Sequence, residues 1–256
     1  LGIYFAGIQM QLVERPRLRT FRRILLPFMA VAGPAIGTQM STPVGNYLLT
    51  GVMAQFGDEA VAAWAVIGRL TVVVFGGIFS LSGAIGGIFG QNYGAGLIDR
   101  VRSTFRDALI FCGIYTLVAW GLLLVATPFV SAAFGLPPEG AAVLKAFTLV
   151  GVGGFIFVGA LFVTNAAFNN LGKPARSTVL NWLKDAAFSW PLALWLAPSF
   201  GASGVIYGQA LAGVLMGTVA VIWGWRYVAG LQPMPTAPLD PDGAQPYPNP
   251  DKHRIR

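Results

Sequence analysis

The sequence predicts an all-α polytopic membrane protein built as a bundle of six transmembrane helices. Of its 256 residues 55% are hydrophobic and 11% are charged, whereas soluble domains average about 25% charged residues. Several apolar runs exceed the roughly 18 residues that mark a membrane span. Basic residues gather beyond alternate ends of these runs, as they do in cytoplasmic loops. Together these three observations place the chain in the membrane class.

The chain opens on an apolar stretch and a basic linker, followed by the first predicted membrane helix. We interpret Leu1 to Ile8 as the end of a preceding helix, so that residues 1–23 form this end and a basic cytoplasmic linker. Ile24 to Gly57 contains no charged residue and predicts a helix. Pro34 and Pro43 interrupt it; within a bundle they predict a kinked helix with two hinges rather than a broken one.

The second predicted helix runs from Ala60 to Gly96 and carries a single charge, Arg69. Its later half contains glycines in i,i+4 pairs, the spacing that allows helix backbones to approach closely in lipid. We therefore expect the other helices to pack around this one. The glycine pairs are Gly83 with Gly87 and Gly86 with Gly90.

Four further helices complete the predicted lobe, which spans residues 24–229. A short charged segment at residues 99–107 is expected to lie at the membrane surface, before the third helix. The predicted ranges of the remaining helices are 108–134, 141–170, 174–197 and 203–227. Residues 230–256 are rich in proline and predict a disordered cytoplasmic tail.

The charges of the loops predict the orientation of the bundle. Loops on one side are basic, with Arg100 to Arg106, then Lys173 and Arg176. Loops on the other side carry Asp58, Glu59 and Glu139. The positive-inside rule then predicts a multi-pass protein of the inner or plasma membrane, with both ends of the bundle in the cytoplasm.

Enzyme chemistry and nucleic-acid binding are not predicted. No catalytic constellation, metal-ligand cluster or cofactor motif is present, and the single histidine, His253, lies in the tail. The one cysteine, Cys112, lies within an apolar run and is interpreted as a packing residue. The net charge of +7 comes from helix ends, without a basic face interleaved with aromatic residues, so nucleic acid is not an expected partner.

Ionisable residues within the apolar runs are the first candidates for function, because a charge in lipid is costly unless it is used or paired. Arg69 and Asp185 both fall near the middle of predicted helices. We predict either an Arg69–Asp185 pair across the bundle, with a possible link to proton movement, or a shallow Lys184 and Asp185 that reach the headgroups.

Uncharged polar residues within the helices are the second candidates. Gln39, Thr42 and Asn46 lie in the proline-containing first helix, and Asn165 lies late in the fourth. Polar groups in lipid face the bundle interior or a wet cavity. We predict that these four residues line a substrate cavity; the alternative is that they form hydrogen bonds between helices.

Several segments resemble, in their order and spacing, the second half of multidrug and toxic compound extrusion (MATE) transporters. Arg69 lies between the first two of these segments. They are Phe56 to Ala63, Gly90 to Ala95, Phe168 to Pro174, Pro191-Leu192 and Phe200 to Val205. The resemblance covers roughly Phe21 to Tyr227, and it depends on the combination of motifs rather than on any one of them.

The resemblance implies one lobe of a two-lobe, twelve-helix transporter whose partner is an amino-terminal six-helix lobe. Such proteins export drugs and toxic organic compounds in exchange for H⁺ or Na⁺. Sodium-coupled members carry carboxylates in the helices that match residues 24–57 and 141–170, and neither range contains Asp or Glu. No coupling-ion site is therefore predicted here, and proton coupling through the other lobe is favoured.

The predicted function is thus that of a transporter lobe in the lipid bilayer that moves a small organic substrate by alternating access. Two alternatives remain open. A related flippase for lipid-linked saccharides is disfavoured because few charged groups are available to line a cleft. A structural membrane subunit without transport activity is the other.

Overall fold

The computed structural model describes residues 18–233, which form six helical rods and contain no strand. The rods are α2 (Leu18–Met53), α3 (Asp58–Gly94), α4 (Ile98–Ala133), α5 with α6 (Pro138–Ala146 and Val152–Asn170), α7 with α8 (Pro174–Trp182 and Trp190–Phe200), and α9 (Ala202–Ala229). The predicted all-α bundle is confirmed. The expectations for the helix end and linker before residue 18 and for the tail beyond residue 233 lie outside the described residues.

Two of the rods contain a π-helical turn. The segment η3 (Phe147–Gly151) joins α5 to α6, and η4 (Leu183–Ser189) joins α7 to α8. A short 3₁₀ turn, η2 (Ala54–Phe56), ends the first rod before Gly57, whose φ of 90° permits the reversal into α3.

The lengths and hydropathy of the rods fit a multi-pass membrane protein. Four segments of the described chain are long and apolar enough to cross a bilayer, namely 58–94, 98–133, 138–170 and 202–229. Arg23–Ala30 and Ala32–Phe56 form a fifth span when taken together, with a bend of 42° between them. The α7–α8 rod is outside this set and carries Arg176, Lys184 and Asp185.

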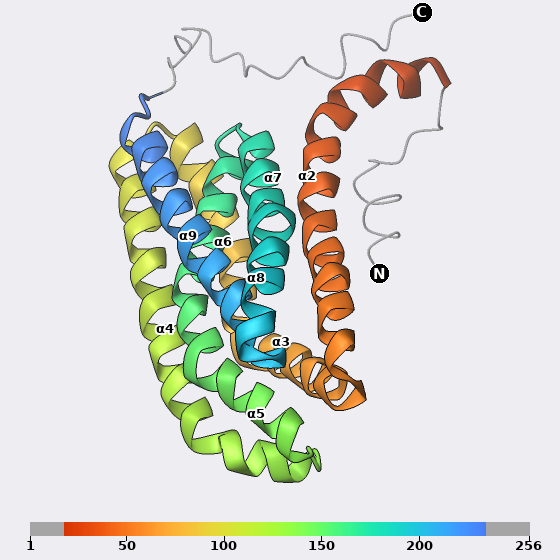
Figure 1. Ribbon diagram of the computed structural model, residues 1–256. Helices are drawn as coiled ribbons and strands as arrows, with labels where there is room; N and C mark the ends of the chain where they lie inside the picture. Colours follow the sequence, from red (N-terminus) through yellow and green to blue (C-terminus); the bar gives the residue numbers. More distant parts are fainter. Residues whose placement is uncertain (1–17, 234–256) are drawn as a thin grey trace, which may run out of the picture.

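The core of the bundle lies along α6 and α9 rather than along α3, so the prediction that the other helices pack around α3 is wrong. Half of the apolar window of the α5–α6 rod and of α9 is buried, against 28% for α3. In Figure 1, α2 and α4 stand on opposite sides, with α6, α8 and α9 between them. A methyl group added to Gly83, Gly87 or Gly90 of α3 would meet nothing within 4 Å, so these glycines do not mediate close helix contacts.

Other glycines do mediate close contacts. On α3, Gly86 is buried and a methyl group there would lie 2.7 Å from Asn170 Nδ2, and further such glycines belong to α9. A methyl group on Gly217 would overlap the Phe157 carbonyl oxygen of α6, and one on Gly204 would lie 2.5 Å from the Leu196 carbonyl oxygen of α8. Spacing alone does not show which face a glycine presents, and on α3 the glycines at positions 83, 87 and 90 are exposed.

The charged segment at residues 99–107 does not precede the third helix as a separate piece, because α4 begins at Ile98 and includes it. Apolar Ile98, Val101 and Phe105 face the core on one side of this first part of the helix. Charged side chains occupy the other side, where Arg102 pairs with Asp99 at 3.1 Å. This periodicity extends the helix beyond the purely apolar run.

Candidate functional site

A cavity of about 540 Å³ lies between α2, α3, α6, η4 and α9. Sites for small organic molecules have volumes of roughly 300–1,000 Å³. Much of the wall is aromatic, including Trp64 and Phe79 from α3 and Phe155 and Phe162 from α6. Phe155 is fixed by stacking on Phe75, with ring centroids 3.9 Å apart. The cavity therefore offers the flat apolar surfaces of a drug-sized site.

Polar side chains reach the same cavity from four elements. They come from the later half of α2, from the middle of α3, from the continuous rod formed by α7 and η4, and from α9. The polar lining residues are Thr42, Asn46, Thr50, Thr71, Asn181, Lys184, Asp185 and Gln209. Such a mixture of a largely apolar wall and a few polar groups is typical of binding sites that orient a ligand.

Asp185 is the most constrained polar residue of this cavity. One carboxylate oxygen, Oδ1, accepts a hydrogen bond from the Lys184 ammonium, and the other, Oδ2, accepts one from Thr42 Oγ1 at 3.3 Å. The side chains of Lys184 and Asp185 are only 13% and 8% exposed. On α2, Gly45 leaves the space that Asp185 occupies. An ion pair is thus buried at the cavity wall and is held there by α2.

The two adjacent charged residues of the cavity wall lie in the π-helical turn η4. In an α-helix, consecutive residues point in directions that differ by about 100°, because 3.6 residues complete a turn. A π-helix closes its hydrogen bonds one residue later and so widens the turn. Lys184 and Asp185 lie at the second and third positions of η4 (Leu183–Ser189), and both line the cavity.

The helix α2 is attached to α7 by hydrogen bonds near Pro34. The Pro34 carbonyl accepts hydrogen bonds from Thr38 Oγ1 at 2.9 Å and from Thr178 Oγ1 at 2.8 Å. Trp182 Nε1 donates to the Gly37 carbonyl at 2.8 Å. The helix continues through Pro34 and Pro43, and its 42° bend lies just before Pro34. The part of α2 that carries Thr42 is therefore held against α7 beyond the bend.

Two of the four predicted cavity residues line the cavity. Thr42 and Asn46 belong to its wall. Gln39 is exposed and lies outside that wall, although it shares a face of α2 with Thr42 and Asn46 at i, i+3 and i+7. Asn165 is 7% exposed and also lies outside it; its backbone carbonyl accepts a hydrogen bond from Ser177 Oγ at 3.4 Å. The structure therefore assigns Asn165 to the packing of α6 against α7.

The structure does not bring Arg69 and Asp185 together as an ion pair. Among the described residues, Asp185 pairs with Lys184, and Arg69 is exposed and absent from the cavity wall. The counter-ion of Asp185 is the ammonium of the neighbouring Lys184, and not Arg69 from across the bundle as predicted. Lys184 itself faces the cavity, so the alternative in which it reaches the headgroups is also not observed.

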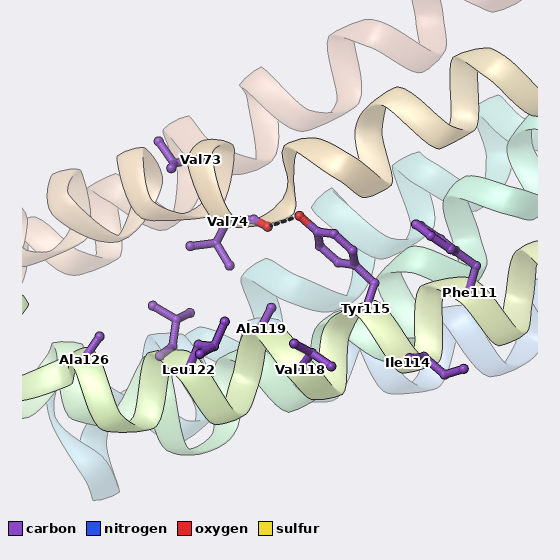
Figure 2. Close-up of a pocket in the computed structure, with 10 residues that line it drawn as sticks. Val73, Val74, Phe111, Ile114, Tyr115, Val118, Ala119, Leu122 and Ala126 are labelled. Atoms are coloured by element: carbon purple, nitrogen blue, oxygen red, sulfur yellow. Dashed lines mark hydrogen bonds between the residues drawn. The ribbon is translucent and has the colours of Figure 1, made fainter.

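A second cavity, of about 590 Å³, lies between α3 and α4 and is almost entirely apolar. Figure 2 shows Tyr115 of α4 reaching across to α3, where its hydroxyl donates a hydrogen bond to the Val74 carbonyl at 2.7 Å. The lining side chains include Val73, Ile114 and Leu122. This groove offers no charged group to orient a solute, so the cavity around Asp185 is the better candidate site.

Comparison with known proteins assigns the fold and the family. The MatE family model matches residues 34–195. A Pseudomonas savastanoi protein, described as an uncharacterized 21 kDa protein of the iaaL 5' region, is 30% identical over 230 residues, which are 87% of this chain and 73% of that protein. A protein of Shewanella oneidensis named as an FAD transporter is 26% identical over 188 residues. These are 73% of this chain and 41% of that protein.

Solved structures of transporters share the fold. The Vibrio cholerae MATE transporter VcmN in its bent form matches with a TM-score of 0.75 and 21% identity, over 81% of this chain and 47% of that one. A MOP superfamily transporter from Pyrococcus furiosus matches with a TM-score of 0.77 and 18% identity, over 89% and 52%. The chain thus spans about half the length of these structures. Family match and fold agree with the resemblance seen in the sequence: this chain belongs to the MATE family of membrane transporters.

Proposed function

We propose that the chain forms one lobe of a cation-coupled antiporter that exports bulky organic compounds by alternating access. The lobe would face a second six-helix lobe across a cleft, and the rocking of the two lobes would expose the site to each side of the membrane in turn. The family match and the share of each solved structure that the chain covers support this arrangement.

The observation that carries the proposal is the cavity around Asp185. It combines aromatic walls with a buried ion pair near the middle of the α7–α8 rod, where a purely structural bundle gains nothing from two charges. Its volume suits a drug-sized compound. A scaffold without transport activity does not account for this cavity.

The proposed orientation places the basic helix ends in the cytoplasm of an inner or plasma membrane. In Figure 1 the junction of α3 with α4 and the junction of α6 with α7 lie at the same end of the bundle. Those junctions carry Arg100, Arg102 and Lys173, whereas Asp58 and Glu139 lie at the opposite end. The positive-inside rule then favours both ends of the bundle in the cytoplasm.

Transport in cells tests the proposal. The gene, with all of its coding sequence, is expressed in a strain that lacks its own efflux pumps, and the loss of a cationic dye is followed. Antiport predicts efflux that stops when the proton or the sodium gradient is dissipated separately, which also identifies the coupling ion. Efflux that survives the loss of both gradients, or no efflux of any probe, contradicts the proposal.

The substrate class is tested in the same strain by a second probe. One relative is named as an FAD transporter, so flavin dinucleotide is followed beside the dye. Movement of a fluorescent lipid-linked saccharide in reconstituted vesicles tests the flippase alternative. Antiport of the dye in the absence of saccharide movement supports the proposed function over that alternative.

A further inference from the structure

The Lys184–Asp185 pair supplies all the charge on the cavity wall. The other lining residues contributed by α2, α3, α6 and α9 are neutral. The two charges cancel, so the cavity wall as a whole is electrically neutral. A charged ligand that enters the cavity must therefore compete with one member of the pair for the other.

The two members of the pair are held very differently. The Cβ of Asp185 packs closely against Gly45, since a methyl group on Gly45 would lie 2.7 Å from it. The carboxylate of Asp185 is held by the hydrogen bond from Thr42. Lys184 has its one hydrogen bond within the described residues to Asp185. A lysine ammonium sits on a flexible four-carbon stem. Lys184 is thus the member that can move, and Asp185 is the fixed point.

The walls around the pair suit a cation. Trp64, Phe155 and Phe162 line the same cavity, and aromatic faces attract organic cations, especially when water is displaced. Trp64 is held in place because its Nε1 donates to Thr50 Oγ1 at 3.0 Å. An anion would find one mobile ammonium and several negative ring faces. A cation would find a fixed carboxylate and rings that complement it.

We propose that Asp185 binds the positively charged group of an organic ligand and that Lys184 is a tethered competitor, which the ligand displaces. Until a ligand arrives, Lys184 occupies the position of the ligand's charge and keeps the carboxylate paired. The inference rests on the proposed function only in treating this cavity as the transport site. It assigns to Lys184 the role of setting affinity, since every cation must first replace it.

Binding to the purified full-length protein in lipid nanodiscs tests this inference, with two probes of the same shape and opposite charge. Tetraphenylphosphonium is the cation and tetraphenylborate is the anion, and titration calorimetry gives the dissociation constants. We expect Lys184→Gln to tighten the binding of tetraphenylphosphonium about tenfold, because it removes the competitor and leaves Asp185 unpaired. Asp185→Asn should weaken that binding about tenfold or more.

Lys145→Gln is the matched control, since Lys145 is an exposed lysine outside the cavity wall, and it should leave both dissociation constants unchanged. A gain of affinity in Lys184→Gln cannot come from misfolding, which keeps the test valid if Asp185→Asn is unstable. Tighter binding of tetraphenylborate than of tetraphenylphosphonium, lost in Lys184→Gln, overturns the inference in favour of an anion site. Unchanged cation binding in Lys184→Gln also overturns it.

The binding test is separate from the transport test. If the dye is exported while Lys184→Gln and Asp185→Asn bind the cation as the unmodified protein does, the proposed function stands and this site is wrong. If the variants behave as expected but no solute moves in cells, the site stands and the antiport proposal is wrong.

Discussion

Gly45 of α2 and Asp185 of η4 lie in direct contact, so closely that a methyl group on Gly45 would come within 2.7 Å of Asp185 Cβ. Two helices far apart in the sequence therefore meet at the one buried carboxylate of the cavity wall. Only a residue without a side chain leaves room for this contact.

Substitution of Gly45 tests that contact. Gly45→Ala should destabilise the folded protein by about 1–3 kcal/mol, because the added methyl pushes η4 away from α2. Gly51→Ala is the control on the same helix, where nothing lies within 4 Å of the new methyl; there alanine should stabilise by about 0.5–1 kcal/mol. Unfolding in detergent gives both free energies, and equal effects of the two substitutions would contradict the close contact.

The packing of α9 against α6 is tested at Gly217. A methyl group there would overlap the Phe157 carbonyl oxygen, which belongs to the backbone and cannot move aside as a flexible side chain could. We expect Gly217→Ala to cost about 1–3 kcal/mol or to prevent folding. Gly121→Ala in α4, with open space around it, should be tolerated. Expression yield and thermal unfolding of the two variants distinguish these outcomes.

Arg176 at the start of α7 lies over three aromatic rings, and its loss should loosen this end of the bundle. Its guanidinium carbon is 5.5, 5.2 and 4.9 Å from the ring centroids of Phe168, Trp223 and Tyr227. Arg176→Gln should lower stability by about 1–2 kcal/mol and change tryptophan fluorescence. Arg226→Gln removes an exposed arginine of α9 and should change neither.

The bend of α2 should depend on Pro34. A proline removes the hydrogen bond to the carbonyl four residues earlier, and the 42° bend lies between Ala30 and Ala32. In Pro34→Ala the helix should straighten, so that spin labels at the exposed positions 26 and 40 move apart. Pro43→Ala, which frees no carbonyl at the bend, serves as control. An identical distance in all three proteins would mean that the bend has another cause.

Asn165 and Asn46 should respond differently to loss of their amide groups. Asn165 Oδ1 is buried and has no hydrogen-bond partner among the described residues, so Asn165→Leu should change stability by less than about 1 kcal/mol or increase it, and leave ligand binding unchanged. Asn46 lines the cavity, and Asn46→Leu should change binding of a cavity ligand. If Asn165→Leu abolished ligand binding and Asn46→Leu did not, Asn165 and not Asn46 would belong to the binding site.

The sequence predicted the six rods because lipid as solvent demands long apolar helices, a signal that is spread over long runs of residues rather than a few positions. It pointed to Thr42 and Asn46, because polar side chains in such runs tend to face the interior, but the same argument placed the exposed Gln39 there too. It could not predict η4, because a π-helical turn has no residue signature.

Other errors arose where spacing does not determine direction. The i,i+4 glycines of α3 have the same spacing as close-packing glycines, but the helix presents positions 83 and 87 outward. Arg69 has the depth of a bundle-facing charge, but it lies on an exposed face. Which face of a helix turns inward is decided by contacts with distant segments, such as Gly217 with Phe157, that one sequence does not reveal.

The adjacency of Lys184 and Asp185 in the chain has an electrical consequence. Moving one elementary charge through a membrane potential changes the free energy by about 2.3 kcal/mol per 100 mV. Because opposite charges sit on neighbouring residues of one rod, they travel together whenever that rod tilts, and the potential does almost no net work on them. Under the proposed alternating access, this buried pair would therefore add almost no voltage penalty when the unloaded lobe reorients.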